Sequence, residues 1–270
     1  MPKYDQGFGA VWSDAAVFYR EGNGTSVTDY HEHDFYEINL ILSGDVKILL
    51  GEGSTEGTGC RIVLTRPHSP HYIACRTDTL YSRIYLMFTE AFVADLFPEW
   101  GQLSAVFGDA GRCATLSAMD AERFRALIEE IGHEQKPFRR RLLIYYFLSL
   151  LGERIGTDSE GRTEIPQYVL EVISYLEHHC SEHIVTSDLA RRMHVGRTTL
   201  MTEFKRYTDS TVGEYLAACR LKHAILSLRE GKTLEEAAER CGYSDVSGLV
   251  RLFRRTYGMT PRQYLKQLGE

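Results

Sequence analysis

The spacing of apolar residues in the first third of the chain predicts strands. Between residues 35 and 88 the apolar residues come in short runs rich in Ile, Val, Leu, Tyr and Phe, and turn-forming segments such as Ser43-Gly44-Asp45 separate these runs. Short β-rich runs interrupted by turn residues are typical of antiparallel strands that close into a barrel or a sandwich. We therefore expect a small antiparallel β-barrel in this part of the chain.

After about residue 118 the apolar spacing becomes helical, and two helices are expected between residues 121 and 155. The second helix is apolar over nearly its whole circumference from Leu142 to Leu151. One face covers the barrel and the first helix absorbs only part of the rest, so the remaining apolar surface needs a partner chain. We expect a two-fold homodimer with Leu148 and Leu151 in its seam.

A polar stretch from residue 156 to residue 164, flanked by glycine and without periodicity, indicates a domain boundary. We expect an N-terminal domain of residues 1–156, a linker of residues 157–165 and a C-terminal domain of residues 166–270. The predicted fold class is α+β multidomain, with an antiparallel β-barrel and two packing helices followed by an all-α domain.

The C-terminal part contains short helices that repeat. Leu189-Ala190-x-Arg192 matches Ala237-Ala238-x-Arg240 at an offset of 48 residues, and further matches follow the next turn at an offset of 49. Two copies of helix, tight turn and helix predict two helix-turn-helix units, at about residues 186–207 and 234–257.

Capping residues indicate where several of these helices begin. Thr211, the Thr233-x-x-Glu236 capping box and Asp245 each precede a helical pattern. The helix expected between the two units, at about residues 212–229, would be about 27 Å long at 1.5 Å per residue. With the thickness of the flanking units added, this length can hold two reading helices roughly 34 Å apart, which is one turn of DNA.

Composition and charge change this picture in two ways. The chain has 270 residues, of which 43% are hydrophobic, and its net charge of −6 argues against nucleic acid until the charge is divided along the chain. Residues 1–160 carry 15 Lys and Arg against 23 Asp and Glu, a net charge of −8, whereas residues 161–270 carry 16 against 14, a net charge of +2. This asymmetry favours two domains with different partners.

The cysteines and the N-terminus bear on the compartment. The six cysteines lie far apart with no CxxC motif, which is typical of reduced, intracellular protein. The N-terminus has no apolar signal core, and no apolar run approaches about 18 residues, so we expect a cytoplasmic protein with no membrane partner.

A constellation of polar residues in the first strand region carries candidate chemistry. In an extended segment His31, His33 and Glu37 point to one side because side chains alternate. His71 could supply a fourth group, and such a set can hold a divalent metal with an open position. Two alternatives remain open: a metal-free pocket for a small ligand, with Tyr36 and Tyr85 among its apolar walls, and a purely structural cluster.

The spacing His31-x-His33-x3-Glu37-x6-Gly44 resembles the first motif of the cupin family, and Pro67 to His71 resembles a degraded second motif. The barrel is accordingly described as cupin-like. This resemblance implies an effector-binding domain whose site residues would be His31, His33, Glu37, His71, Tyr36 and Tyr85. The same resemblance makes His31, His33, Glu37 and His71 the candidate metal ligands.

Each helix-turn-helix unit has an outward helix face of polar and basic residues. Leu200 and Phe204, like Leu249 and Phe253, are spaced i, i+4 and should face the helical core. Arginine pairs with guanine and Thr or Val methyl groups meet the thymine methyl, whereas basic residues near helix ends contact phosphates. The expected DNA-binding residues are Arg197, Thr198, Met201, Thr202, Lys205, Arg206, Ser247, Val250, Arg251, Arg254 and Arg255.

Residues 188–265 resemble the DNA-binding domain of the AraC/XylS family of bacterial transcription regulators. The motif residues that carry the resemblance are Ala238, Gly242-Tyr243-Ser244-Asp245, Phe253-Arg254-Arg255, Tyr257-Gly258-Met259-Thr260-Pro261 and Tyr264. The chain departs from the family pattern at Thr202 and Glu203 in the first reading helix. In the second, Gly248-Leu249 replaces a usual aromatic pair, and a glycine inside a helix costs about 0.5–1 kcal/mol.

The resemblance implies a cytoplasmic transcription regulator that binds promoter DNA and responds to a small-molecule effector, such as a sugar or a related metabolite, in the barrel. It also implies a homodimer, and contact with RNA polymerase if the protein is an activator. We expect no enzymatic activity and no cofactor. The alternative is a metal-dependent cupin enzyme fused to a DNA-binding tail.

Overall fold

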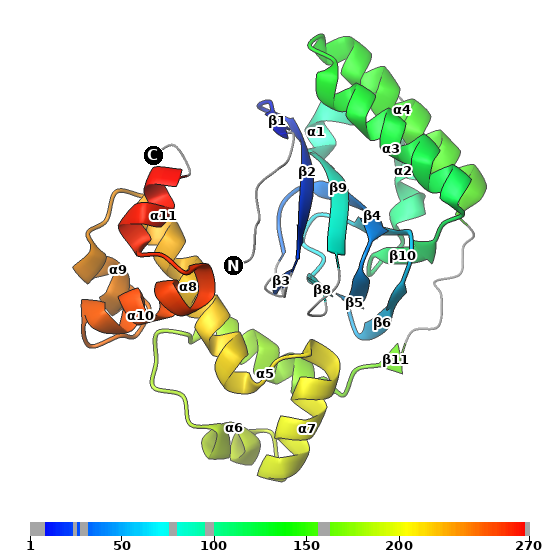
Figure 1. Cartoon of the computed structure of the whole chain (residues 1–270). Helices are drawn as coiled ribbons and strands as arrows, with labels where there is room; N and C mark the ends of the chain where they lie inside the picture. The colour runs from blue at the N-terminus through cyan, green and yellow to red at the C-terminus, as the bar shows by residue number, and fades with distance from the viewer. Residues whose placement is uncertain are drawn as a thin grey trace. The chain divides into compact units, whose positions relative to one another are not determined.

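The computed structural model describes residues 9–23, 26–27, 32–75, 80–94, 100–155 and 163–267. The chain divides into two compact units, residues 2–164 and residues 165–270, and each is described by itself. Figure 1 shows the first unit as strands with a pair of long helices, and the second as helices alone. The expected fold class, an antiparallel sheet domain followed by a helical domain, is confirmed.

Two sheets form the first unit, and their described strand pairs are all antiparallel. One sheet has the order β1 (Gly9–Val11), β2 (Ala15–Asn23), β9 (Leu80–Phe88), β4 (Tyr36–Ser43), β7 (Arg61–Thr65) and β10 (Arg112–Thr115). The other has the order β11 (Thr163–Glu164), β6 (Gly53–Thr58), β5 (Asp45–Leu50), β8 (His71–Cys75) and β3 (Ser26–Val27).

The short strand β11 corrects part of the linker prediction. Thr163 and Glu164 pair with Ser54 and Gly53 of β6, so these two residues extend the smaller sheet instead of joining the units. A strand of two residues has no periodicity to read, which is why the sequence pattern gave no sign of it. The rest of the expected linker, residues 157–162, lies outside the described residues.

Strand β4 separates the two cores of this unit. Successive side chains of a strand point to opposite faces of the sheet. Ile38 and Leu40 accordingly belong to the cluster shared with the helices, whereas Ile41 belongs to a second cluster with residues of both sheets. That second cluster fills the space between the two sheets. It consists of Ile41, Val46, Ile48, Leu50, Val63, Ile73, Cys75, Tyr81 and Cys113.

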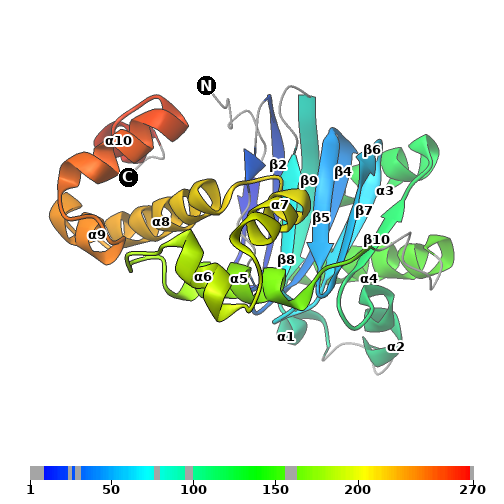
Figure 2. The same ribbon diagram turned by 90° about the horizontal axis from the view of Figure 1, so that it is seen from below.

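Helices cover the other face of the six-stranded sheet. Helices α3 (Ala118–His133) and α4 (Pro137–Arg154) lie side by side there (Figures 1 and 2), and α3 contacts β2, β4 and β9. The side chain of Ser117 accepts a hydrogen bond from the Asp120 backbone N–H and so begins α3, while Pro137 begins α4. Shorter helices complete the unit: α1 (Glu90–Val93), α2 (Trp100–Ser104) and the 3-10 turn η1 (Ala105–Phe107).

The expected dimer seam is wrong in its residues. Leu148 and Leu151 are fully buried within their own chain, in the core that α4 shares with α3 and the sheet. The exposed apolar side chains of α4 are instead Phe138, Leu142 and Tyr146, with exposed fractions of 60%, 41% and 50%. These three residues recur every four positions and so form one stripe of the helix. Because α4 is apolar over nearly its whole circumference, its sequence did not indicate which side of the helix α3 and the sheet would cover.

The second unit consists of short helices around one long helix. They are α5 (Gln167–His178), α6 (Thr186–Arg192), α7 (Arg197–Thr208), α8 (Val212–Arg229), α9 (Leu234–Arg240), α10 (Val246–Tyr257) and α11 (Pro261–Gln267). Helix α8 contacts α5 and α7 and also contacts α9 and α10, so it connects the two repeats. Its 18 residues correspond to about 27 Å of helix, as expected.

The capping predictions are confirmed. Thr211 and Glu214 form a capping box at the start of α8, and Thr233 and Glu236 form another at the start of α9. The side chain of Asp245 accepts a hydrogen bond from the Gly248 backbone N–H, at 2.9 Å, and begins α10. Each cap satisfies backbone N–H groups that the first helical turn leaves without a partner in the helix.

In both repeats, the turn between the two helices contains a residue with positive φ at the same position. His194 has φ of 54° in the first turn, and Gly242 has φ of 75° at the matching place in the second. A Cβ atom on Gly242 would also collide with the backbone of Ser181, so only glycine fits there. Helices α6 and α7, like α9 and α10, are therefore turned against each other as a helix-turn-helix pair.

Among the described residues, no helix combines the length and the apolar character that crossing a bilayer requires.

Candidate functional site: a ligand pocket and a nucleic-acid interface

A cavity of about 260 Å³ lies on the inner face of the six-stranded sheet. Strands β4 and β9 line it from one side, and the start of β8 lines it from the other. Both polar and apolar side chains line it, as in a small-molecule pocket. The lining residues are His33, Phe35, Glu37, Asn39, His71, Ile73, Arg83, Tyr85 and Met87.

Three polar side chains meet at the carboxylate of Glu37, which is buried. Oε2 of Glu37 lies 2.8 Å from Nε2 of His33 and 3.2 Å from Nε2 of His71. Its other oxygen, Oε1, accepts a hydrogen bond of 2.7 Å from the Asn39 amide. The two imidazole rings lie edge to face, with centroids 4.9 Å apart.

The backbone fixes both histidine rings. Nδ1 of His33 lies 3.0 Å from the carbonyl oxygen of Phe35, and Nδ1 of His71 lies 2.9 Å from that of Ser69. A carbonyl oxygen can only accept, so Nδ1 carries a proton in both rings. The backbone N–H of His68 donates to the carbonyl of His33 at 2.7 Å, which joins the segment before β4 to the segment before β8.

A buried cation completes the polar wall. The guanidinium of Arg83 donates to Oδ1 of Asn39 at 3.3 Å and lies over the ring of Tyr85, at 4.9 Å from its centroid. Burial alone raises the pKa of the Glu37 carboxyl, but contacts with His33 and His71 and the charge of Arg83 outweigh burial and hold this pKa well below its ordinary value. The pocket therefore holds a carboxylate among positive or proton-donating groups.

The structure brings most of the residues expected at this site together. His33, Glu37, His71 and Tyr85 line one cavity, whereas His31 lies outside the described residues. The prediction that Tyr36 lines this pocket is wrong. This residue points away from the cavity and packs against Phe88, Trp100 and Phe107 on the helix-covered side of the sheet. Adjacent strand residues face opposite ways, so Tyr36 cannot share a face with Glu37.

Sequence reasoning missed Asn39, Arg83 and Met87. The alternation of side chains along a strand could have indicated all three, because every second residue points to the same face of the sheet. Asn39 lies two residues after Glu37 on β4, and Arg83 and Met87 lie two residues before and after Tyr85 on β9. The strand register then brings the two sets together, since Glu37 pairs with Met87 and Asn39 with Tyr85. The register is the information that the sequence alone did not supply.

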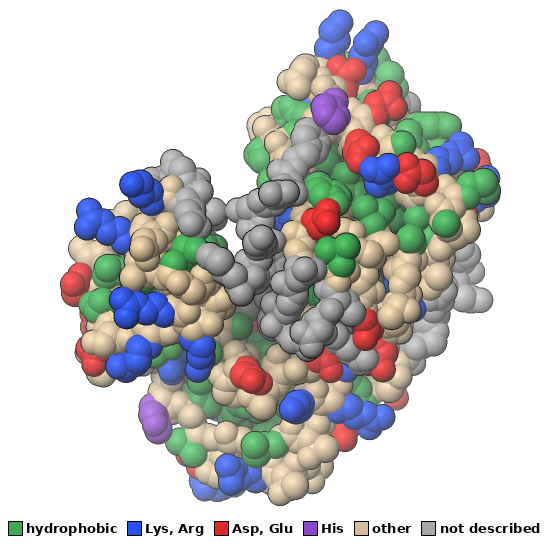
Figure 3. All heavy atoms as spheres, in the orientation of Figure 1, with side chains coloured by type: hydrophobic (Ala, Val, Ile, Leu, Met, Phe, Trp, Pro, Cys, Tyr) green, Lys and Arg blue, Asp and Glu red, His purple; other side chains and the backbone are tan. Residues whose placement is uncertain are grey.

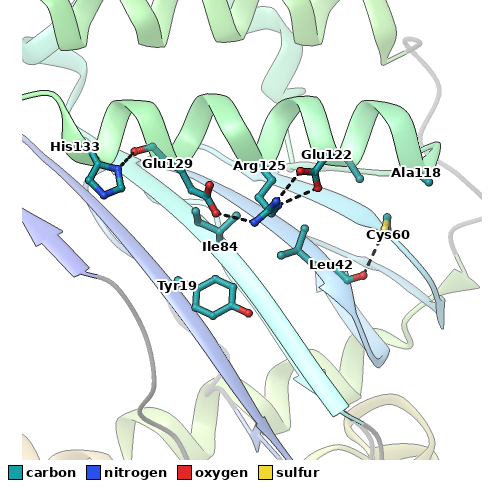
Figure 4. A pocket seen from close by; sticks show the side chains of 10 residues that line it. Tyr19, Leu42, Cys60, Ile84, Ala118, Glu122, Arg125, Glu129 and His133 are labelled. Atoms are coloured by element: carbon teal, nitrogen blue, oxygen red, sulfur yellow. Dashed lines mark hydrogen bonds and ion pairs between the residues drawn. The ribbon is translucent and has the colours of Figure 1, made fainter.

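A second cavity, of about 630 Å³, lies between α3 and the outer face of the same sheet (Figure 4). It is lined by Leu42 and Ile84 of the sheet and by Arg125 of α3, whose side chain extends toward the sheet. Arg125 donates to Glu122 at 2.6 Å and 3.0 Å and to Glu129 at 3.0 Å, so its guanidinium is engaged on both sides. None of the residues expected to bind an effector lies here.

The expected DNA-binding residues of the first repeat lie on the outside of α7. Leu200 and Phe204 are fully buried in the helical core, as their spacing predicted. The opposite face is exposed and carries Arg197, Thr198, Met201, Thr202, Lys205 and Arg206. Of these, Arg206 is paired with Glu203 at 3.5 Å and lies over the ring of Tyr207.

Helix α10 of the second repeat has the same arrangement. Leu249 and Phe253 are fully buried, while Ser247, Arg251, Arg254 and Arg255 are exposed and Val250 is half-buried. Figure 3 shows Lys and Arg side chains over the α9 to α11 end of this unit and over the α6 and α7 end. Each repeat thus presents a helix face with both hydrogen-bonding and basic side chains, which is what reading DNA in the major groove requires.

A tandem pair of helix-turn-helix units, preceded by an antiparallel sheet domain with a ligand-sized pocket, defines a ligand-responsive DNA-binding regulator. Family models agree with this class. Residues 15–151 match the model described as the AraC-like ligand binding domain, and residues 189–267 match a helix-turn-helix domain. The chain belongs to the AraC family and is a DNA-binding transcription regulator with an N-terminal ligand-binding domain.

Curated relatives span most of the chain. An HTH-type transcriptional activator RhaS of Yersinia pestis bv. Antiqua (strain Angola) is 25% identical over 255 residues, which are 88% of this chain and 89% of the relative. The RhaS of Klebsiella pneumoniae (strain 342) is 26% identical over 242 residues, 86% of this chain and 85% of the relative.

Solved structures show weaker likeness. A variant of apo ToxT from Vibrio cholerae has a TM-score of 0.45 and 15% identity, covering 95% of this chain and 98% of that chain. The DNA-binding domain of AdpA, in complex with a target DNA, has a TM-score of 0.35 and 28% identity, covering 37% of this chain and 90% of that chain.

Proposed function

We propose that this chain activates transcription from promoters to which α7 and α10 bind together, and that a small molecule in the pocket of Glu37 controls that binding. The observation that carries the proposal is the repeated outward face: each expected reading position is exposed or half-exposed, on two helices joined by α8. The relatives named as transcriptional activators support activation. Activation implies a contact with RNA polymerase, and promoter DNA as the target implies a cytoplasmic location.

The roles of the outward side chains follow from their chemistry. Arg251 can pair with guanine through two hydrogen bonds, and Thr198 and Thr202 can meet base edges through hydroxyl and methyl groups. Lys205, Arg254 and Arg255 lie toward the C-terminal ends of their helices and contact phosphates, which position the protein without specifying sequence. Arg206 must release Glu203 to do the same, so it contributes less.

The helical unit binds DNA without the rest of the chain in this proposal. Helices α8, α9 and α10 share a core of their own, which includes Leu221, Ala224 and Phe253. Helix α5 supplies Val169, Val172 and Ile173 to the other half of the unit, and these residues are fully buried. Residues 166–270 therefore contain the hydrophobic contacts that their folding needs.

The effector is a small polar molecule, such as a sugar or a related metabolite. A cavity of about 260 Å³ admits a molecule of that size, and its wall offers hydrogen-bonding groups from Asn39, Arg83 and Glu37 between apolar side chains. The proposal is regulatory and not catalytic: the effector would shift the balance between conformations only as far as its affinity for them differs.

The dimer is retained in the proposal with a different seam. Phe138, Leu142 and Tyr146 of α4 form an exposed apolar stripe, and Met119 of α3 is 73% exposed. The hydroxyl of Tyr146 accepts a hydrogen bond from Arg123 of α3, at 3.2 Å, so both helices border this surface. A self-complementary stripe on a helix pair suits a two-fold contact between two copies of the chain.

The experiment screens a metabolite library for compounds that raise the melting temperature of the full chain, and then measures DNA binding with each compound. A ligand at about 100 times its Kd should stabilise the protein by about 2.7 kcal/mol. We expect Asn39→Ala to abolish this stabilisation and to leave DNA binding without the compound unchanged. A compound that changes DNA affinity equally in Asn39→Ala would exclude this pocket as the effector site.

A further inference from the structure

The cavity of about 630 Å³ between α3 and the outer face of the six-stranded sheet has the volume of a small-molecule site (Figure 4). Pockets for small organic ligands have volumes of about 300–1,000 Å³. Along β9 the side chain of Ile84 lines this cavity, whereas Arg83 and Tyr85 line the Glu37 pocket on the other face. The sheet therefore separates the two cavities, and each takes its own occupant.

The sheet supplies an apolar wall that the chain itself leaves partly uncovered. Leu42 and Tyr19 line the cavity and are half-buried, although both pack against the core beneath the helices. Helix α3 contributes the small side chains of Ala118 and Ala121 to the same cavity. A molecule with an apolar body would remove Leu42 and Tyr19 from water, and this burial of apolar surface favours binding.

The charged groups of this cavity include more carboxylates than cations. Arg125 donates to both oxygens of Glu122, at 3.0 Å and 2.6 Å, and to Oε1 of Glu129 at 3.0 Å. On the sheet, the Tyr19 hydroxyl donates to Glu21 at 2.7 Å, and this hydrogen bond is the main cause that raises the pKa of Tyr19 to about 12. Tyr19 is therefore neutral at pH 7, and three carboxylates are balanced by one guanidinium.

This imbalance determines the charge of the occupant. Arg125 already donates hydrogen bonds to two carboxylates, so a bound anion would have to displace one of them. A carboxylate has about four lone-pair sites, so an ammonium group can donate to Glu129 while Arg125 keeps its hydrogen bond to Oε1. Within the described part of the chain, these carboxylates do not form a group of three metal ligands. The cavity thus favours an organic cation over an anion or a metal ion.

We infer that this cavity binds a small amphipathic organic cation, such as an aryl-alkyl amine, with its ammonium group at Glu129 and its apolar body against Leu42 and Ile84. This site is additional to the effector pocket of the proposed function and does not depend on it. Because the occupant would contact both α3 and the sheet in the folded chain, its binding should also raise the melting temperature.

The test is isothermal titration calorimetry of the full chain with three probes that share one apolar body and differ in charge. The probes are naphthylethylamine, naphthylethanol and naphthylacetate, measured at physiological salt so that long-range charge effects are screened. We expect one amine to bind per chain, about tenfold or more tightly than the alcohol, because hydrogen bonds to charged groups are the stronger ones. Naphthylacetate should bind more weakly than the alcohol.

Variants on α3 locate the ammonium group. Glu129→Gln should weaken amine binding by about three- to tenfold and leave binding of the alcohol unchanged. Glu130→Gln is the matched control, since it removes the same charge from the next residue, whose exposed side chain does not line the cavity. Ala118→Phe should weaken binding of the amine and of the alcohol alike, because the added ring occupies part of the cavity.

Three results would overturn the inference: no amine bound by the wild-type chain, naphthylacetate bound more tightly than the amine, or equal effects of Glu129→Gln and Glu130→Gln. Asn39→Ala should leave amine affinity unchanged, and a loss of amine binding in this variant would place the amine in the Glu37 pocket instead. Circular dichroism identifies a loss of folding, and the milder Glu129→Gln keeps the test valid if Ala118→Phe unfolds. Failure of the amine to bind leaves the proposed function intact, because that function uses the other cavity.

Discussion

The Cβ atom that Gly248 lacks would lie 2.6 Å from Cδ1 of Tyr243. The ring of Tyr243 thus packs directly on the backbone of α10, and the guanidinium of Arg220 on α8 lies 5.2 Å from the centroid of the same ring. The glycine that looked like a departure from the family pattern is the space into which this ring fits. The packing of the Tyr243 ring fixes the start of α10 against the turn between α9 and α10.

Replacing Gly248 should therefore destabilise the second repeat, although alanine is the better helix former. We expect Gly248→Ala to lower the free energy of unfolding by about 1–3 kcal/mol, because the added methyl group overpacks the site. Gly213 is the control: it lies in α8 with no atom near its missing Cβ, so Gly213→Ala should stabilise by about 0.4–1 kcal/mol. Thermal unfolding followed by circular dichroism measures both, and a Gly248→Ala chain as stable as Gly213→Ala would refute the packing argument.

Two arginines of α10 should differ in what they do to DNA. We expect Arg251→Ala to relax preference at one base pair, at a cost of about 1–3 kcal/mol for the preferred base. Arg255→Ala should weaken binding to all sequences alike and reduce the salt slope by about one. Equilibrium binding to single-base variants of a selected site, at several salt concentrations, separates the two effects. Identical behaviour of both variants would contradict the division into a reader and an anchor.

The dimer proposal predicts different results for glutamate substitutions of exposed and of buried side chains on α4. Leu142→Glu and Tyr146→Glu should give folded monomers, because these side chains are exposed in the isolated chain. Leu148→Glu should unfold the domain, because it would bury an unpaired charge in the core. Sedimentation velocity and circular dichroism decide between these outcomes. Persistent dimers of Leu142→Glu and Tyr146→Glu would rule out this stripe as the seam.

The capping box of α9 should make stability depend on pH. The Thr233 backbone N–H donates to Glu236 at 2.8 Å and holds the pKa of that carboxyl below its ordinary value of 4.5. A lowered folded-state pKa means that the contribution is present above pH 4.5 and is lost as pH falls through the folded pKa. Glu236→Ala should lower the melting temperature at pH 7, and the difference from wild type should shrink toward pH 3. Glu235→Ala in the same turn, without this contact, is the control, and a pH-independent difference for Glu236→Ala would contradict the mechanism.

Local signals in the sequence predicted local structure well. Thr211, Thr233 and Asp245 were identified as caps because a cap depends on residues three or four positions away. The burial of Leu200, Phe204, Leu249 and Phe253 could be predicted from helical spacing alone. Once these residues were placed in the core, the residues on the outward faces of α7 and α10 could be predicted as well. The glycine at position 248 was read only as a cost to the helix, since nothing in the sequence states that the Tyr243 ring turns back onto it.

Features that depend on distant packing were predicted less well. Leu148 and Leu151 lie in an apolar helix, and only the docking of α4 on the sheet and α3 decides that they face inward while Leu142 faces out. At the pocket, Glu37 and His71 come from different sheets and meet through the closure of the sandwich, which the spacing of motifs suggested. Arg83 joins them only through the register of β4 and β9, which no local pattern encodes.

The central claim is that both outward helices of one chain read the same DNA segment. Hydroxyl-radical footprinting of the full chain on a site selected from random duplexes tests it most directly. We expect two protected blocks per chain, about 10 base pairs apart on one face of the DNA, with Arg197→Ala weakening one block and Arg251→Ala the other. A single protected block, or two blocks that respond to Arg197→Ala alone, would contradict reading by both helices.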